Sequence, residues 1–260
     1  MNRITDRFNA IKSGASKPLI CFLTAGDPDL ATTARIVPAI HKAGADIVEL
    51  GIPFSDPMAD GPVIQAAGFR ALQNGATVDG VFECVREIRK TCEIPLVLMT
   101  YFNPVQHYGL ERFAKTAIES GADGAILTDL PADEANEWVQ ACEKHNLATV
   151  FLVAPTSTDD RVRLTADCTT GFVYCVSRLG VTGTQSSLAS GLSELVARIK
   201  SLTDKPVAVG FGISTAEQVH EVSQSADGVV VGSALVKVIA SSATPDEAVE
   251  NAVKFVSGLR

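Results

Sequence analysis

Short apolar runs alternate with amphipathic stretches along the whole chain. The apolar runs are rich in Val, Ile and Leu, and they lack the polar alternation that a half-exposed strand shows. Such runs are typical of strands that are buried on both faces, as in a parallel sheet covered by helices. Eight strands are predicted on this basis, at residues 19–26, 46–51, 96–101, 124–129, 148–153, 171–177, 206–212 and 228–234.

The stretches between these runs place apolar residues three or four positions apart, which is the spacing of an amphipathic helix. Helices are predicted at residues 3–13, 29–43, 62–74, 78–91, 110–119, 133–145, 159–165, 189–202, 215–223 and 245–257. Eight strand–helix units in 260 residues favour a (β/α)8 TIM barrel, with a doubly wound sheet as the alternative. We expect a single domain over residues 1–260, to which helix 3–13 is an N-terminal addition.

Three related phrases stand directly before predicted strands: AGAD at 43–46, SGADG at 120–124 and SADG at 225–228. In the first two, the glycine is expected to end the preceding helix in the left-handed conformation, and the residues after it lead into the strand. The phrases therefore support a chain built from repeated helix–strand units.

The composition and net charge of the chain limit the classes of partner that it is expected to bind. The formal net charge of -8 and the pI of about 5.0 argue against a nucleic-acid or membrane surface as the partner. No apolar run approaches the length of a transmembrane span, and the N-terminus has no signal-peptide core. The six cysteines form no CxxC pair, as expected for a reduced cytoplasmic protein. The histidines are scattered without metal-binding spacing, so no metal site is expected.

The strand at 46–51 departs from the apolar pattern at Glu49. An acid is expensive to bury among Val, Ile and Leu, whereas strand ends in parallel α/β folds carry catalytic residues. The Pro- and Gly-rich loop that follows brings a second acid, Asp60. Solvated surface carboxylates are the simpler interpretation, and it fits Asp60 better than Glu49. One acid on a rigid strand and another on a loop predict acid–base chemistry.

Glycine-rich segments end the last three predicted strands, at 177–185, 209–214 and 230–236. Small residues let backbone N–H groups approach a ligand, and a helix that starts there adds the positive end of its dipole. TIM barrels often bind phosphate after strands seven and eight, beside a short extra helix. We expect this phosphate-binding helix to start at Gly232-Ser233, and the long loop around Gly183 to act as a lid.

The order and spacing of several motifs resemble those of the tryptophan synthase α subunit family. These motifs are ELGIPFSDPMADGPVIQ, YFNPVQHYG, TDLPADE, VAPTSTDDR, SRLGVTG and GFGIS, and together they span nearly the whole chain. The resemblance implies that Glu49 and Asp60 are the catalytic pair. It also implies substrate-binding roles for Tyr174, Thr182, Gly183, Phe211, Gly212, Gly232 and Ser233. Two departures from the family pattern are Thr128, where proline is expected, and Gly68, where a polar residue is more usual.

The family resemblance implies a lyase that cleaves indole-3-glycerol phosphate to indole and glyceraldehyde 3-phosphate without a metal or an organic cofactor. In this retro-aldol reaction Glu49 is expected to move protons, and Asp60 is expected to face the indole N–H. The resemblance also implies a partner, the tryptophan synthase β subunit, which takes up the indole in an α2β2 assembly. We expect their contact at the C-terminal face of the barrel, where loops containing residues 53–60, 103–107 and 131–133 project together.

Two other functions are compatible with a phosphate-binding barrel. A phosphosugar isomerase or epimerase shares the phosphate site, but such enzymes use other acid–base sets, often with a metal, and are not expected to carry the PFSDPxADGP loop. A non-enzymatic subunit that binds a phosphate ligand and activates a partner is the third hypothesis, and the intact pair of Glu49 and Asp60 argues against it. Release of indole from indole-3-glycerol phosphate separates the three.

Overall fold

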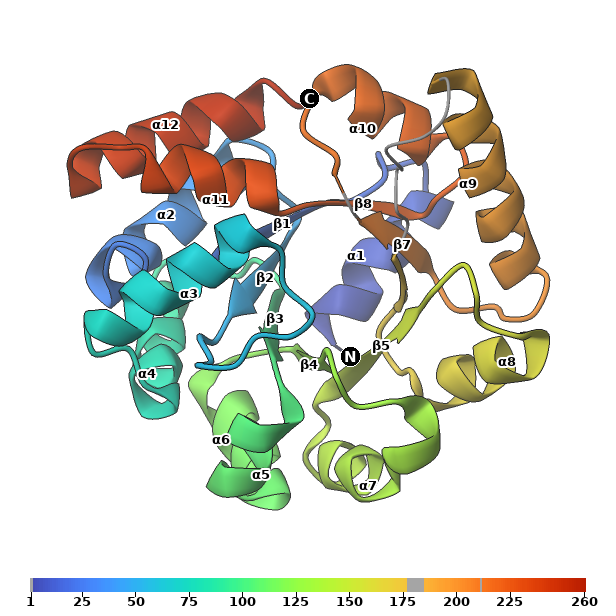
Figure 1. The fold of residues 1–260 in the computed structure, drawn as a ribbon, viewed down its shortest axis with the longest axis horizontal. Helices are drawn as coiled ribbons and strands as arrows, with labels where there is room; N and C mark the ends of the chain where they lie inside the picture. Colours follow the sequence, from blue (N-terminus) through green and yellow to red (C-terminus); the bar gives the residue numbers. More distant parts are fainter. Residues whose placement is uncertain (1, 177–184, 211) are drawn as a thin grey trace.

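The eight strands close into one parallel ring in the computed structural model, which describes residues 2–176, 185–210 and 212–260 (Figure 1). Each strand pairs with its neighbours in sequence, and β8 returns to β1. The strands are β1 (Leu19–Thr24), β2 (Ile47–Gly51), β3 (Leu96–Thr100), β4 (Gly124–Leu127), β5 (Ala148–Val153), β6 (Val173–Val176), β7 (Val207–Gly210) and β8 (Gly228–Val231). All eight fall within the predicted ranges, so the predicted TIM barrel is confirmed.

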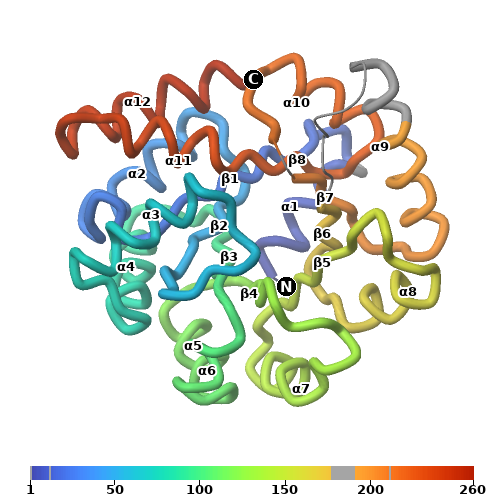
Figure 2. Tube along the Cα trace, in the orientation of Figure 1, coloured from blue at the N-terminus to red at the C-terminus, as the bar shows by residue number. Residues whose placement is uncertain are grey.

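The helices lie around the outer side of this ring, except for α1, which closes one end of it (Figure 2). They are α1 (Arg3–Lys12), α2 (Leu30–Lys42), α3 (Pro62–Gln73), α4 (Val78–Arg89), α5 (Phe102–Tyr108), α6 (Leu110–Ser120), η1 (Ala132–Glu134), α7 (Asn136–His145), α8 (Asp159–Cys168), α9 (Gln185–Lys200), α10 (Ala216–Ser223), α11 (Ser233–Ala240) and α12 (Pro245–Ser257). The predicted short helix after the last strand is α11, and the predicted N-terminal addition is α1.

Helix α5 corrects the sequence analysis, which places residues 103–107 in a loop. Pro104 suggests a break in regular structure, but it stands in the first turn of α5, where proline is tolerated because the N–H it lacks has no helical partner. The helix ends at Gly109, whose φ of 93° turns the chain directly into α6. Most of the motif YFNPVQHYG is therefore helical.

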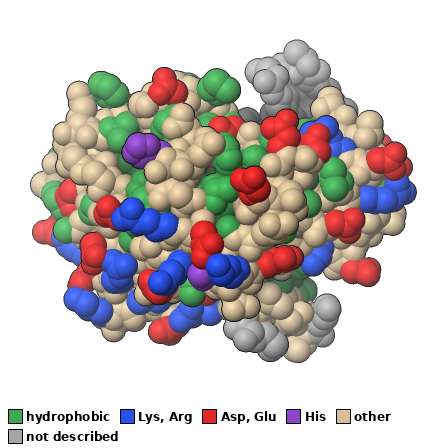
Figure 3. Space-filling model, turned by 90° about the horizontal axis from the view of Figure 1, so that it is seen from below, with side chains coloured by type: hydrophobic (Ala, Val, Ile, Leu, Met, Phe, Trp, Pro, Cys, Tyr) green, Lys and Arg blue, Asp and Glu red, His purple; other side chains and the backbone are tan. Residues whose placement is uncertain are grey.

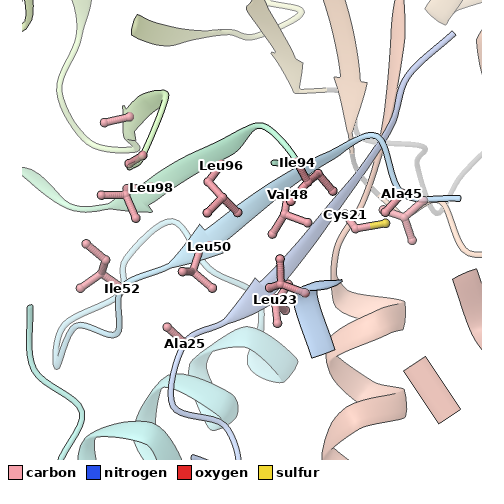
Figure 4. Close-up of a cluster of buried hydrophobic side chains, with 14 of the residues drawn as sticks. Cys21, Leu23, Ala25, Ala45, Val48, Leu50, Ile52, Ile94, Leu96 and Leu98 are labelled. Atoms are coloured by element: carbon pink, nitrogen blue, oxygen red, sulfur yellow. The ribbon is translucent and has the colours of Figure 1, made fainter. Parts of the chain in front are cut away.

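Alternate residues of each strand face two different cores. On β2, Ile47 points into the barrel, whereas Val48 and Leu50 pack outward in the layer between strands and helices. Figure 4 shows part of that outer layer, where Val48 and Leu50 lie beside Leu96 and Leu98 of β3. Because both faces are buried, the strands need apolar residues at successive positions, and the alternation seen in half-exposed strands is lost.

Helix α1 closes the N-terminal end of the barrel. Its buried residues Ile4 and Phe8 join the cluster inside the strands, and the Phe8 ring centroid lies 5.4 Å from that of Phe172. Gly124 and Gly228 begin β4 and β8 at this end. A Cβ on Gly124 would lie 3.0 Å from Ile4 Cδ1, and one on Gly228 would lie 3.3 Å from the Phe8 ring. Glycine at these strand starts therefore makes room for α1.

A side-chain clamp joins the strands in pairs at the same end. Each of the three repeated phrases supplies an aspartate whose carboxylate accepts the N–H of the first residue of the preceding strand. The clamps are Asp46 with Leu19 at 2.8 Å, Asp123 with Leu96 at 2.8 Å and Asp227 with Val207 at 3.0 Å. Between β5 and β6 the hydroxyl of Thr170 plays this part, and it accepts the N–H of Thr149 at 2.9 Å. The repeated phrases thus mark links between strands as well as helix ends.

The outer surface mixes both signs of charge. Across the face shown in Figure 3, Lys and Arg side chains lie among Asp and Glu side chains. This face shows no strongly basic stripe of the kind that binds nucleic acid. Of the helices in the described ranges, none is long and apolar enough to cross a membrane.

We predict that Asp123→Ala lowers the free energy of unfolding by about 3 kcal/mol, measured by urea denaturation. Asp123 is 3% exposed and also pairs with Arg89, whose side chain is 10% exposed, so the substitution leaves a buried guanidinium without its carboxylate partner and the Leu96 N–H without its acceptor. Glu93→Ala is the control, because the Glu93 side chain is 72% exposed and its pair with Arg3 contributes less than about 1 kcal/mol. Equal losses in the two variants would contradict the clamp.

Candidate active site

A cavity of about 490 Å³ opens at the C-terminal ends of the strands. Its walls come from the ends of the strands, the segment that joins β2 to α3, and the start of α11. Glu49 and Asp60 both line it, so the structure brings the two predicted acids into one cavity. Most of the remaining wall is apolar, which is the usual character of a small-molecule site.

Glu49 lies at the floor of this cavity because of its position on β2. It shares the inward face with Ile47, between the register neighbours Phe22 on β1 and Val97 on β3. The next inward residue is Gly51, and a Cβ there would lie 2.7 Å from the Phe22 ring. Because Gly51 has no side chain, the Phe22 ring has space to lie beside Glu49. The acid therefore has an apolar neighbour on the cavity wall.

The carboxyl group of Glu49 has no hydrogen-bond partner in the part of the chain that the structure describes. The residue is 0% exposed, and both carboxyl oxygens are buried and unpaired. Burial disfavours the charged form and raises the pKa of Glu49 from 4.5 to about 8. At neutral pH the group is therefore mostly a neutral acid with a proton to give.

Asp60 has a different environment, on the segment between β2 and α3. The phenol of Tyr101 donates a hydrogen bond to Asp60 Oδ2 at 3.0 Å, and the N–H of Ala59 donates to the same phenol oxygen at 3.0 Å. The Tyr101 ring also packs against Phe54, with ring centroids 5.3 Å apart. Partial burial raises the pKa of Asp60, and the Tyr101 hydrogen bond acts in the opposite direction. The loop acid is thus held in place by a side chain from the end of β3.

Tyr174 on β6 lines the same cavity. Burial raises the pKa of its phenol well above the ordinary value, and the nearby charge of Glu49 adds to the effect. Gly210 on the neighbouring β7 is what leaves space for the phenol, because a Cβ there would overlap the Tyr174 hydroxyl. Tyr174 therefore lies in the same cavity as Glu49.

The opposite end of the cavity contains the predicted phosphate residues Gly212, Gly232 and Ser233. Gly232 is the N-cap of α11 and Ser233 is its first residue, so the positive end of the helix dipole faces this end. Gly212 has a φ of 73°, in the left-handed region that favours glycine, and a Cβ there would meet no atom of the described residues within 4 Å. A side chain at Gly212 would therefore enter the cavity. Lys237, on the second turn of α11, also lines it.

Comparison with known proteins identifies the family. The family model of the tryptophan synthase alpha chain matches residues 8–259. This chain belongs to that family. The alpha chain of Geobacter sulfurreducens is 48% identical over 260 residues, covering 100% of this chain and 98% of the relative. That of Solibacter usitatus is 51% identical over 243 residues, covering 94% of this chain and 91% of the relative. Membership makes this chain a lyase of tryptophan biosynthesis.

Solved structures agree with this family assignment. The tryptophan synthase subunit alpha of Legionella pneumophila superposes with a TM-score of 0.92 at 38% identity, covering 100% of this chain and 97% of that one. A chain of the tryptophan synthase a2b2 complex from Pyrococcus furiosus gives a TM-score of 0.87 at 43% identity, covering 94% and 99%.

The alpha-chain family pattern names three substrate-binding residues that lie outside the described residues: Thr182, Gly183 and Phe211. Conversely, the structure places several residues at the cavity that the sequence analysis does not single out. They are Phe22, Ile64, Met99, Leu152 and Lys237. Those on strands share a signal, since they occupy inward positions near a strand end. Tyr101 was missed as well, because its link to Asp60 joins residues from two different strand ends.

We predict that Glu49→Gln stabilises the protein, and increasingly so at higher pH. The folded-state pKa of about 8 lies above the ordinary 4.5. Below pH 4.5 the acid is protonated in both the folded and the unfolded state, so it does not lower the free energy of unfolding. Between pH 4.5 and 8 it ionises only in the unfolded state, so the loss of stability grows with pH. Above pH 8 the loss is complete. Unfolding free energies of both proteins from pH 5 to 9 should diverge by up to about 5 kcal/mol in favour of the variant. A constant difference across this range would show that the carboxyl group is not held neutral by the fold.

Proposed function

We propose that this chain cleaves indole-3-glycerol phosphate to indole and glyceraldehyde 3-phosphate, with Glu49 as proton shuttle and Asp60 as partner of the indole N–H. The observation that carries the proposal is the unlike pair of acids in one cavity. Glu49 is buried with a raised pKa and has no hydrogen-bond partner in the part of the chain that the structure describes, whereas Asp60 accepts a hydrogen bond from the Tyr101 phenol. Unlike environments of this kind separate the roles of two carboxyl groups.

Glu49 can serve both proton transfers of the reaction. In the first step protonated Glu49 donates its proton to C3 of the indole ring, and the ring nitrogen becomes positively charged. The resulting carboxylate then takes the proton from the hydroxyl group on the carbon attached to C3. The bond between that carbon and C3 breaks, its electron pair returns to the ring, and the hydroxyl-bearing carbon becomes the aldehyde. Glu49 ends the cycle protonated, as it began.

Asp60 supports the intermediate between these steps. Its Oδ2 is taken by the Tyr101 phenol, which leaves the other carboxylate oxygen to accept the indole N–H. A fixed negative charge stabilises the positive ring nitrogen most strongly in a cavity with apolar walls, where screening is weak. Because only protons and electron pairs move, the proposed reaction requires no metal or organic cofactor.

The phosphate group is proposed to bind at the other end of the cavity, against Gly212, Gly232 and Ser233. The start of α11 offers backbone N–H groups and the helix dipole, and the Ser233 hydroxyl adds a donor. Thr182, Gly183 and Phe211 belong to the same proposal through the family pattern. Binding the phosphate far from the reacting bond helps to position the indole between the two acids.

We also propose that the chain acts with a tryptophan synthase β subunit in an α2β2 assembly, as in the Pyrococcus furiosus a2b2 complex. The contact surface is assigned to the C-terminal face, where the segment after β2, helix α5 and helix η1 follow adjacent strands. Met58 in the first of these is 86% exposed, which is unusual for a large apolar side chain.

A single domain over residues 1–260 and a cytoplasmic location complete the proposal, the latter supported by six free cysteines.

We predict that Glu49→Gln and Asp60→Asn each reduce indole release from indole-3-glycerol phosphate by about 10²–10⁴-fold. In the unmodified chain kcat/KM should fall as pH rises through about 8, because Glu49 loses the proton it must donate. It should also fall at low pH, where Asp60 becomes protonated. Asp56→Asn is the control, since Asp56 is an exposed acid on the same segment, and its side chain hydrogen-bonds only to Ser55 among the described residues. An active Glu49→Gln variant would overturn the role of this residue.

At the phosphate end we predict that Gly232→Ala raises KM for indole-3-glycerol phosphate with little change in melting temperature. A Cβ on Gly232 would lie 3.5 Å from Phe22, an ordinary contact distance, so the methyl group meets no steric clash there. Gly212→Val should raise KM too, but its φ of 73° adds a loss of stability. Gly191→Ala on α9 is the neutral control, because a Cβ there meets nothing. An unchanged KM in Gly232→Ala would place the phosphate elsewhere.

For the partner we predict weak activity of the isolated chain and a marked rise when a cognate β subunit is titrated in. Docking is proposed to order the segment that carries Asp60. Met58→Ser should require more β subunit for half-maximal activation. Leu164→Ser is the control and should not, because Leu164 is also exposed and apolar but lies on α8, which is not one of the elements assigned to the contact surface. Equal activity with and without the β subunit would instead identify a stand-alone lyase.

A further inference from the structure

Helix α3 leads directly out of the segment that carries Asp60, and it is packed more lightly than the next helix, α4. Its buried residues are all small: Ala67, Gly68 and Ala71. Val63 and Ile64 are half-buried, in a small cluster apart from the main core. Helix α4 instead buries larger side chains in the main core: Val81, Phe82, Cys84, Val85 and Ile88. Because small residues bury little apolar area, packing alone holds α3 less firmly than α4.

An ion pair holds the far end of α3. Arg70, in the last turn of the helix, donates two hydrogen bonds to Asp27, from Nε to Oδ1 at 2.9 Å and from Nη2 to Oδ2 at 2.7 Å. The Asp27 side chain is 4% exposed. Asn74, the C-cap of α3, also donates from Nδ2 to the carbonyl of Pro28 at 2.6 Å. Two parallel bonds to a carboxylate fix the direction of an arginine as well as its distance, so this end of α3 has a defined place.

Asp27 lies in the turn after β1, and this turn is itself fixed. Strand β1 is paired with β2 on one side and with β8 on the other. In the turn, the N–H of Gly26 donates to the hydroxyl of the buried Thr33 at 3.1 Å. A Cβ on Gly26 would lie 3.2 Å from the Cβ of Ala71, so the turn touches α3 directly. Asp27 therefore joins α3 to a part of the barrel that cannot move independently of the strands.

The first turn of α3 is tied to Asp60. Gly61, the residue after Asp60, is the N-cap of the helix, and Gln65 Nε2 donates to the carbonyl oxygen of Asp60 at 2.8 Å. Pro62 is the first residue of α3, where proline does not interrupt a helix. A displacement of α3 is therefore passed to the backbone of Asp60.

We propose that Asp27 and Arg70 are positioning residues for Asp60: their ion pair holds α3 against the end of β1, and α3 sets where the Asp60 carboxylate lies in the cavity. Tyr101 holds the carboxylate itself, whereas the ion pair holds the backbone that carries it. Among the described residues that line the cavity, neither Asp27 nor Arg70 is present, so the pair acts through other residues. This inference rests on the proposed function, in which Asp60 faces the indole N–H.

Loss of the ion pair is expected to lower kcat about 10- to 100-fold, because a displacement of about 1 Å at a reacting group has an effect of this size. KM for indole-3-glycerol phosphate should change less than about twofold, since the groups proposed to bind the phosphate lie on other elements. The ion pair thus differs from Gly232, where substitution is predicted to act on KM.

The first test compares Asp27→Ala, Arg70→Ala and the double variant with indole-3-glycerol phosphate as substrate. Each of the three removes the same contact, so their losses of kcat should be similar, and the loss in the double variant should be far below the product of the single losses. Asp27→Ala is the safer single variant for folding, because the Arg70 side chain is already 40% exposed and can be solvated, whereas Arg70→Ala leaves a buried carboxylate unpaired.

Asp123→Ala is the matched control. The Asp123 side chain is likewise 4% exposed and likewise pairs with an arginine, but it lies at the N-terminal end of the barrel. This variant should lose stability while its kcat stays within about twofold of that of the unmodified chain. The control separates a general effect of losing a buried ion pair from an effect on Asp60.

The second test asks whether the ion pair acts through Asp60. In an Asp60→Asn background, Asp27→Ala should lower the remaining kcat by less than about twofold, because the charge whose place the pair controls is gone. A loss of folded protein would instead lower kcat by the same factor in both backgrounds.

The inference is overturned by equal factors in the two backgrounds, by a kcat of Asp27→Ala within twofold of that of the unmodified chain, or by a change confined to KM. Failure of the proposed function has a different sign, because Asp60→Asn then retains activity and the inference falls with it. If Asp60→Asn is inactive while any of the three overturning results is found, only the positioning role of the ion pair is lost.

Discussion

The carboxyl group of Glu49 is buried without a hydrogen-bond partner among the described residues, and the rest of the site depends on the fold tolerating that cost. An unpaired buried polar group costs a few kcal/mol, and an ionised one costs more. The strand cannot move to relieve it, because β2 is paired in register with β1 and β3 on both sides. The acid escapes part of the penalty by keeping its proton, which is the form needed to protonate a carbon atom. The barrel thus exchanges stability for a proton donor at neutral pH.

The two ends of the barrel treat carboxylates in opposite ways. At the N-terminal end, Asp46, Asp123 and Asp227 each accept a strand N–H and pair with at least one Lys or Arg. At the C-terminal end Glu49 has neither kind of partner in the ranges that the structure describes. Satisfied acids stabilise the closed ring, and that rigid ring is what holds an unsatisfied acid in a fixed place. The division matches the general separation of stability and catalysis between the two ends of TIM barrels.

Much of this structure could be predicted from the sequence, and the features that could not be predicted have a common cause. Strand positions followed from apolar runs, and Glu49 stood out because it broke one of them. The contact between Tyr101 and Asp60 joins residues 41 positions apart, and no local pattern records such a contact. Helix α5 was missed because Pro104 suggests a break unless its place within the first turn is known. The left-handed backbone of Gly212 is likewise a property of the folded loop, since its composition alone allows either sign of φ.

In the proposed reaction, the distribution of charge in the cavity gives the substrate one favourable orientation. Burial favours the neutral form of Glu49, so a phosphate dianion meets less repulsion than two ionised acids would create. The start of α11 and Lys237 are the groups proposed to attract the phosphate. The same proposal directs the indole N–H, a donor, to Asp60 and places C3 of the ring over Glu49. On this proposal the raised pKa of Glu49 acts twice, as the source of the proton and as the reason that an anionic substrate can enter a site built from two acids.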